Sequence, residues 1–170
     1  MLDKLYITPR QWLQILRWAL YSLLFLSVMM VQTVVLGNRT VFGTHPSFVP
    51  IVITCVCLRE GAERGGLFAL LASLFWCLSG ADLGSMSILI LTVLPVLGAL
   101  LCKAMLNNRF LPCLAISFLT LACDQFIGFL LKYFFGHIPA ALFTRELLPC
   151  VFLSILSQPL LYWLVQGIAK

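Results

Sequence analysis

Long stretches of apolar residues with almost no charge, separated by short polar segments, recur along the whole chain. Six such stretches lie at residues 18–36, 48–58, 65–78, 85–102, 111–131 and 147–168. About 20 apolar residues let a helix cross the hydrocarbon core of a membrane, and only helices or closed barrels satisfy their backbone there. The pattern therefore predicts an all-α fold, a polytopic membrane helix bundle of about six transmembrane helices with short loops. We expect residues 1–170 to form a single integral membrane domain.

The second stretch is the weakest, because residues 48–58 provide only 11 positions and follow Pro46 and Pro50. A helix of that length covers roughly 16 Å, about half of the hydrocarbon core. We therefore expect it to begin earlier, near Phe42, to lie in a thinned region, or to be broken and sheltered by protein. The third stretch, 65–78, is also short.

The first 17 residues are amphipathic. Thr8 and Gln11 have the spacing of a capping box, and Arg10, Gln14 and Arg17 share one helical face. Residues 1–17 are therefore either a short interfacial helix lying on the membrane or the polar start of the first span.

Composition supports a membrane protein. Hydrophobic residues make up 62% of the chain and charged residues 10%, with a mean hydropathy of +1.06, whereas soluble domains carry roughly 25% charged residues. The net charge of +5 does not indicate nucleic-acid binding, because no basic stripe lies outside the apolar stretches. Most Lys and Arg residues fall before residue 18, in 59–64, in 103–109 and at the C-terminus. The positive-inside rule then predicts that both termini are cytoplasmic, with membrane lipid as the surroundings.

Residues 58–73, "LREGAERGGLFALLAS", join a dense group of charges to a ladder of small residues. The charges have opposite signs, so we expect them to pair locally in a cytoplasmic turn: Arg59, Glu60, Glu63 and Arg64. Small residues recur at every fourth position, and the spacing returns once further on: Gly61, Gly65, Ala69, Ser73, and then Gly80 and Gly84. Positions four apart lie on one helical ridge, and small residues there let a neighbouring helix approach closely in lipid. The ladder predicts that 65–78 is a central helix, packed along much of its length. It leaves open whether the contact is internal or with a partner.

Asp124 is the one acidic residue deep within a stretch, and Gln125 follows it. A carboxylate at the membrane centre costs about 2.5–3.5 kcal/mol, so it needs a partner or a wet cavity. Gln32 and Gln158 are candidate partners. Asp124 is either an interhelical anchor or proton-linked site, or a protonated acid bonded within the bundle.

Signatures of catalysis and metal binding are missing from the sequence. There is no H-E-x-x-H motif, no phosphate-binding loop, no paired carboxylates and no histidine within a stretch to activate a nucleophile. The seven cysteines show no C-x-x-C spacing, so we interpret them as small apolar residues with free thiols. We therefore expect no enzyme, no metal and no cofactor.

The region 46–100 resembles the rod shape-determining protein MreD family. The resemblance rests on Pro46 and Pro50, on Arg59-Glu60-Gly61, on the glycine-rich start of 65–78, on Leu78-Ser79-Gly80 and on Leu83-Gly84. One position departs from it: Trp76 stands where the family leads us to expect an acid, four residues before Gly80.

The resemblance implies a non-enzymatic scaffold subunit of the bacterial cell-elongation machinery in the cytoplasmic membrane. Its implied partners are an MreC-type single-span protein and, through it, the actin-like MreB and the glycan polymerase–transpeptidase pair. Such a scaffold supports cell shape and lateral peptidoglycan synthesis.

A second reading is the substrate-binding membrane subunit of an energy-coupling-factor type vitamin transporter, which has similar length and helix number. That family is similar in size, but its first helix carries a small-residue docking face. Here Ala19 is followed four places later by Leu23, so that face is missing. A ligand pocket near Asp124 would favour this reading.

Overall fold

The structure, a computed structural model of the chain, describes residues 9–35, 46–79, 85–105, 110–136 and 141–168. Every regular element in these ranges is helical, as the apolar pattern predicts, and none of the described residues forms a strand. The elements in chain order are α1 (Pro9–Met30), the π-helical η2 (Val31–Val35), α2 (Val49–Glu60), α3 (Ala62–Leu78), α4 (Ser85–Met105), α5 (Phe110–Gly136), α6 (Ala141–Leu156) and α7 (Gln158–Ile168).

Among the described residues, four segments are long and apolar enough to cross a membrane. They cover residues 11–34, 86–103, 110–131 and 149–168, the last formed by α6 and α7 in succession. By contrast, α2 has 12 residues and α3 has 17, which correspond to about 18 Å and 26 Å of helix. The chain is thus an all-helical protein with four candidate membrane spans and two shorter helices between them.

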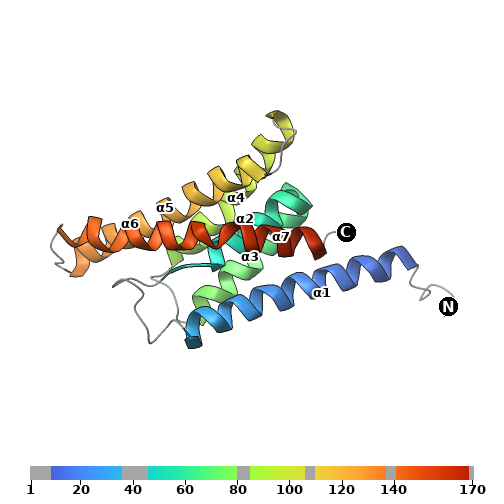
Figure 1. Cartoon of the computed structure of the whole chain (residues 1–170), viewed down its shortest axis with the longest axis horizontal. Coiled ribbons are helices and arrows are strands. Elements are labelled where there is room, and N and C mark those ends of the chain that lie inside the picture. Colours follow the sequence, from blue (N-terminus) through green and yellow to red (C-terminus); the bar gives the residue numbers. More distant parts are fainter. Residues whose placement is uncertain (1–8, 36–45, 80–84, 106–109, 137–140, 169–170) are drawn as a thin grey trace.

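The helices run alternately in opposite directions when α6 and α7, which follow one another in line, are counted as one segment (Figure 1). The start of α1 and the end of α7 lie at the same end of the bundle, and the turn between α2 and α3 also lies towards that end (Figure 1). Residues 9–17 belong to the same continuous helix as the first span, so this region is the polar start of α1 rather than a separate helix. Its residues 11–16 are all exposed.

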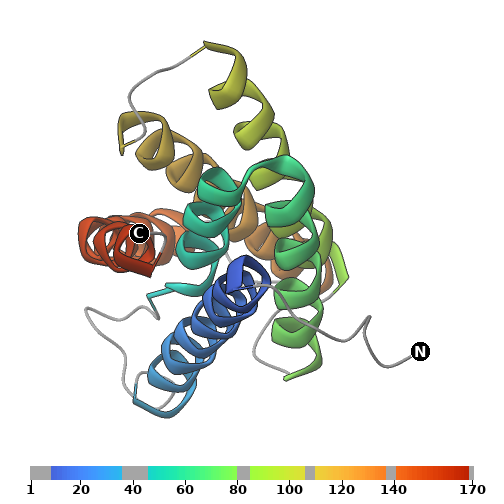
Figure 2. The same cartoon turned by 90° about the vertical axis from the view of Figure 1, so that its right-hand side faces the viewer.

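The short helix α2 occupies the centre of the molecule. It packs against α1, α3, α4, α5 and α7, which surround it when the bundle is viewed along its length (Figure 2). All nine residues from Val49 to Cys57 are buried. The prediction that 65–78 is a central helix packed along much of its length is correct as to the packing, because one face of α3 is buried from Gly65 to Trp76 against α2 and α4. The centre of the bundle, however, is α2, and α3 lies beside it.

The two faces of α3 differ in side-chain size. Its buried face is mostly small, with Gly65, Ala69, Ala72 and Ser73 beside Phe68 and Trp76. Its outer face is large and apolar, with Leu67, Leu70, Leu71, Leu74, Phe75 and Leu78 exposed. A helix apolar on all sides suits a lipid environment, and close packing rather than polarity then decides which face turns inward.

Aromatic side chains join α1 to α3. The ring of Phe68 lies 6.1–6.5 Å from the rings of Trp18, Tyr21 and Phe25, and Phe25 also meets Phe75 at 6.4 Å. Edge contacts of this kind contribute about 0.5–1.5 kcal/mol each beyond the buried area. They fix α1 against the hairpin that α2 and α3 form.

Candidate functional site

The amino-terminal end of α2 is held by side chains from other helices. The Gln32 Oε1 atom, in η2, accepts hydrogen bonds from the backbone N–H groups of Phe48 at 2.9 Å and Val49 at 3.2 Å. The backbone N–H of Ser47 donates to the Ser154 hydroxyl of α6 at 2.9 Å.

The remaining donors of this first turn are also accounted for. Pro50 has no N–H, and the N–H groups of Ile51 and Val52 both donate to the Phe48 carbonyl, at 3.1 Å and 3.2 Å. A helix normally leaves its first N–H groups without intrahelical partners, and in lipid each would be costly. Here the Gln32 side chain and the Phe48 carbonyl accept from them, and Ser154 of α6 accepts from the N–H of Ser47 just before the helix.

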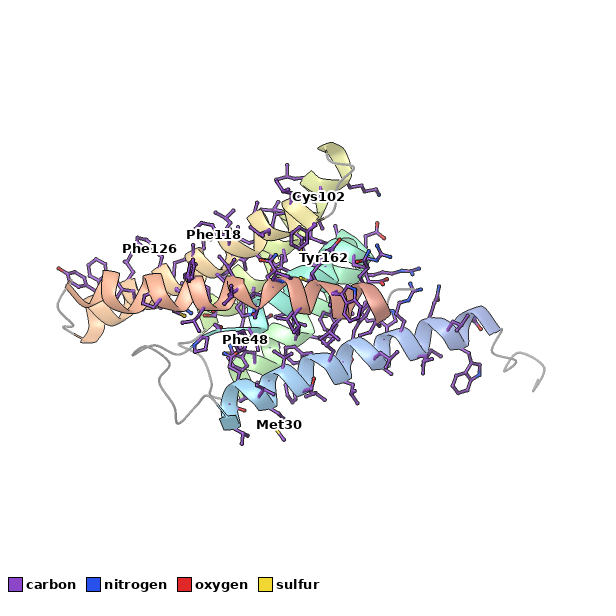
Figure 3. All side chains as sticks on the ribbon, in the orientation of Figure 1. Met30, Phe48, Cys102, Phe118, Phe126 and Tyr162 are labelled. Atoms are coloured by element: carbon purple, nitrogen blue, oxygen red, sulfur yellow. The ribbon has the colours of Figure 1, made fainter. Side chains whose placement is uncertain are left out.

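A helix can therefore begin at mid-depth of this bundle. Phe48, just before α2, lies between the two ends of the molecule, whereas Phe126 lies towards one end and Cys102 towards the other (Figure 3). Of the three alternatives for the second stretch, the structure agrees with the last in that protein shelters the helix, but α2 is short and continuous rather than partly broken. It begins at Val49 and not near Phe42, which lies outside the described residues.

A single residue separates α2 from α3. Gly61 has φ +90°, a backbone conformation that side chains with a Cβ rarely adopt. Its N–H donates to the Cys57 carbonyl at 3.0 Å, and its own carbonyl accepts from the Gly65 N–H at 2.8 Å. Gly61 thus ends one helix and begins the next, which turns the chain back on itself.

Gly65 is the point of closest approach between the two helices. A Cβ atom placed there would lie 2.5 Å from the Cys57 Cα and 2.8 Å from the Cys57 carbonyl oxygen. These are backbone atoms that cannot move aside without shifting α2. The small-residue ladder left open whether the close contact was internal or with a partner. At Gly65 the contact is internal, with the central helix α2.

Further along the ladder, Ser73 contacts a different helix. Ala69 is fully buried, and the Ser73 hydroxyl lies 3.1 Å from the Thr92 hydroxyl of α4. Gly80 and Gly84 lie outside the described residues. In place of the acid that the resemblance led us to expect, Trp76 fills the core at 4% exposure.

The charged turn is connected to α1. The Tyr21 hydroxyl donates to the Glu60 carboxylate at 2.9 Å, and the Arg17 guanidinium lies 3.7 Å from the same oxygen. Among the described residues no ion pair joins Arg59, Glu60, Glu63 and Arg64 to one another, so the expectation of local pairing is wrong. The partner of Glu60 comes from α1, about forty positions earlier in the chain.

Two cavities flank this turn. One, of about 580 Å³, lies between the turn and the ends of α4 and α5; its polar lining includes Arg59, Glu60, Glu63, Arg64 and Lys103. The other, of about 650 Å³, lies between α1 and α3 and is lined by Gln11, Gln14, Ile15, Trp18, Glu63, Arg64 and Leu67. The charged turn therefore forms the wall between two openings at one end of the bundle.

Asp124 is buried in α5 at 7% exposure, and Gln125 beside it is half-buried. The two candidate partners bind elsewhere: Gln32 at the start of α2, and Gln158 to the Ser117 hydroxyl at 3.2 Å and the Cys113 thiol at 3.8 Å. Asp124 lies within electrostatic range of Cys150 in α6. Both alternatives for the role of Asp124 stay predictions.

The cysteines in the described ranges are free thiols. Cys55 of α2 and Cys113 of α5 are both buried, with their sulfur atoms 3.4 Å apart. Within the part of the chain that the structure describes, no group of three or more His, Cys, Asp or Glu side chains is placed to hold a metal ion.

Gln32 and Tyr21 were not identified as key residues of this region from sequence. Gln32 was noted only as a possible partner of Asp124, and Tyr21 is an ordinary residue of an apolar stretch. A polar residue in a span signals a hydrogen bond, but spacing does not identify its partner across 16 positions.

These features define a class of protein: an all-helical chain with four membrane-crossing candidates around a buried half-length helix. Comparison with family models, with curated proteins and with solved structures finds no match to this chain. A more particular assignment therefore rests on the residues of the hairpin and is a proposal.

Proposed function

We propose that the chain is a non-enzymatic scaffold subunit of the bacterial cell-elongation machinery, similar to the MreD family, in the cytoplasmic membrane. It holds partner proteins together by helix–helix contacts and so supports lateral peptidoglycan synthesis and rod shape.

One observation carries the proposal: three of the residues on which the resemblance rests, Pro50, Gly61 and Gly65, also build the α2–α3 hairpin. Pro50 removes a donor at the buried start of α2, Gly61 of the Arg59-Glu60-Gly61 motif makes the one-residue turn, and Gly65 allows the close backbone contact. A chance match of short apolar motifs gives no reason for this coincidence.

The proposed topology counts α2 and α3 as the second and third of six passes. The turn between them then lies on the same side as both termini. The excess of Lys and Arg at that end favours the cytoplasm. This orientation leaves Arg59, Glu60, Glu63 and Arg64 in cytoplasmic water.

The molecule also offers surfaces suited to membrane partners. The outer face of α3 exposes six large apolar side chains from Leu67 to Leu78. The proposed partner is a single-span protein of the MreC type, which would link the scaffold to MreB and to the glycan polymerase–transpeptidase pair.

The test is affinity purification of the tagged chain from native bacterial membranes, combined with rescue of a strain that lacks its own rod-shape scaffold. We expect a single-span partner and cell-wall synthesis proteins to co-purify, and rod shape to be restored. Gly65→Leu should abolish both, and Gly167→Leu should preserve both, because a Cβ at Gly167 meets nothing within 4 Å.

The transporter reading remains the second candidate and is tested by the same purification. It predicts recovery of paired ATPase subunits and a tightly held small molecule. Both cavities described above lie at the charged end, and Asp124 is 12 residues beyond Pro112, about 18 Å along α5. This placement favours the scaffold.

A further inference from the structure

The cavity between the charged turn and the ends of α4 and α5 gathers cations from three helices. Arg59 belongs to the last turn of α2, Arg64 to the first turns of α3, and Lys103 to the last turn of α4. Three basic side chains from separate elements converge on one opening of about 580 Å³.

The carboxylates of the cavity only partly offset this charge. Glu60 is 9% exposed at its side chain and is engaged by Tyr21 and by Arg17, which does not line the cavity. Glu63 is exposed and, like Arg64, lines the second cavity as well. With Glu60 balanced from α1, three cations face one carboxylate, so the opening attracts anions.

The other walls of the cavity are apolar. They consist of Leu58, Ala99, Leu100 and Pro112, with Cys102. A free inorganic anion would gain nothing from such walls, whereas a phospholipid places its glycerol and first methylene groups beside its phosphate. The combination of basic rim and apolar wall therefore fits an amphiphilic ligand.

The depth of the cavity is also appropriate. The apolar span in α4 ends at Lys103, and the span in α5 begins at Phe110. The cavity thus lies where the spans leave the hydrocarbon core, the level at which lipid headgroups lie. Basic pockets between helices at this level are known to bind anionic headgroups.

We propose that this cavity binds the phosphate group of an anionic phospholipid, with Arg59, Arg64 and Lys103 as the cationic contacts. No side chain caps the amino-terminus of α3, whose first residues line the same opening, so the helix dipole adds a favourable contribution. This inference stands independently of the proposed scaffold function.

The test measures lipid binding to the purified full-length chain in neutral detergent by native mass spectrometry. Phosphatidylglycerol, phosphatidylcholine and inorganic phosphate are the three probes. Lys103→Gln and Arg64→Gln remove exposed cations and should each weaken phosphatidylglycerol binding about fivefold, corresponding to about 1 kcal/mol per cation near a membrane surface. The double variant should lose roughly 25-fold, the product of two such steps.

The matched control is Lys132→Gln, which removes a cation 20 residues beyond Pro112, about 30 Å along α5. We expect it to leave phosphatidylglycerol binding unchanged. Thermal unfolding in phosphatidylcholine alone confirms that all four variants remain folded.

Three results would overturn the proposal. The first is equal affinity for phosphatidylglycerol and phosphatidylcholine. The second is an equal loss in Lys132→Gln, which would mean that general surface charge attracts the lipid. The third is saturation by inorganic phosphate with no advantage for the lipid, which would assign the cavity to a free anion.

Discussion

The two helices of the hairpin have similar apolar compositions but opposite surroundings. In α2, every residue from Val49 to Cys57 is buried, and the helix contacts five others. In α3, one face is buried against α2 and α4, and the other exposes large apolar residues, with Leu78 at 84%.

The difference shows what determines which helix face is buried when all faces are apolar. In lipid there is little hydrophobic force between helices, so contact goes to surfaces that pack closely. Small residues on one face of α3 bring it against α2, and satisfied backbone donors allow α2 to begin inside the protein. Packing and hydrogen bonding, rather than hydrophobicity, set the architecture.

Replacing Gly65 tests the packing half of this comparison and should have the largest effect. Gly65→Leu places a side chain against the backbone of Cys57, which is 2.5 Å from the required Cβ position. We expect a loss of more than about 3 kcal/mol, because overpacking against backbone cannot be relieved by rotamer changes. Thermal unfolding in detergent measures it. Gly167→Leu, in open space on α7, should unfold like the wild type.

Replacing Gln32 tests the hydrogen-bonding half. Gln32→Ala leaves the N–H groups of Phe48 and Val49 without their acceptor inside the bundle. We expect a loss of about 2 kcal/mol, since each unsatisfied buried donor costs about 1–3 kcal/mol. Gln14→Ala, at an exposed site on α1, is the control. Equal unfolding curves for the two variants would mean that the start of α2 has another source of stability.

The contact between α1 and the charged turn should have a smaller effect. Tyr21→Phe keeps the aromatic packing and removes the hydrogen bond to Glu60. We expect a loss of about 1 kcal/mol, the net contribution of a typical hydrogen bond. Tyr162→Phe is the matched control, because its ring packs on Phe110 and its hydroxyl has no hydrogen bond among the described contacts. If Tyr21→Phe unfolds at the same temperature as the wild type, the hydrogen bond from α1 does not stabilise the charged turn.

The hydroxyl pair between α3 and α4 should have the smallest effect. A double-mutant cycle of Ser73→Ala and Thr92→Val isolates their 3.1 Å contact. We expect a coupling energy of about 0.6 kcal/mol, the average for such pairs in membrane proteins. Pairing Ser73→Ala with Thr120→Val, whose hydroxyl bonds its own helix, should give no coupling. A similar coupling energy in both cycles would contradict a specific contact between Ser73 and Thr92.

The sequence predicted the elements of the fold better than their places in it. The apolar pattern predicted helices throughout, and the second stretch begins within one residue of its predicted start at Phe48. An apolar run of 11 residues has the same composition whether lipid or protein surrounds it. The central position of α2 therefore depended on contacts that no local pattern contains.

Contacts between residues far apart in the sequence were not predicted, for the same reason. The ladder indicated a close contact at Gly65, but the contact with Cys57 follows from the one-residue turn at Gly61. Glu60 was expected to pair within its own turn, yet its hydrogen bond comes from Tyr21, because the direction of α1 brings that residue alongside. Gln32 reaches α2 from a π-helical segment, a local change of period that the apolar pattern does not indicate.

Disulfide trapping tests most directly whether α2 is enclosed by the bundle. Cys55 and Cys113 are kept and the other cysteines replaced, and membranes are treated with a lipid-permeant copper–phenanthroline oxidant. Because the two sulfur atoms lie 3.4 Å apart, we predict rapid intramolecular cross-linking. The control keeps Cys55 and Cys77, which are offset by about 15 Å along the hairpin and should not cross-link. Absence of the Cys55–Cys113 bond, or its formation no faster than in the control, would contradict a helix α2 buried against α5.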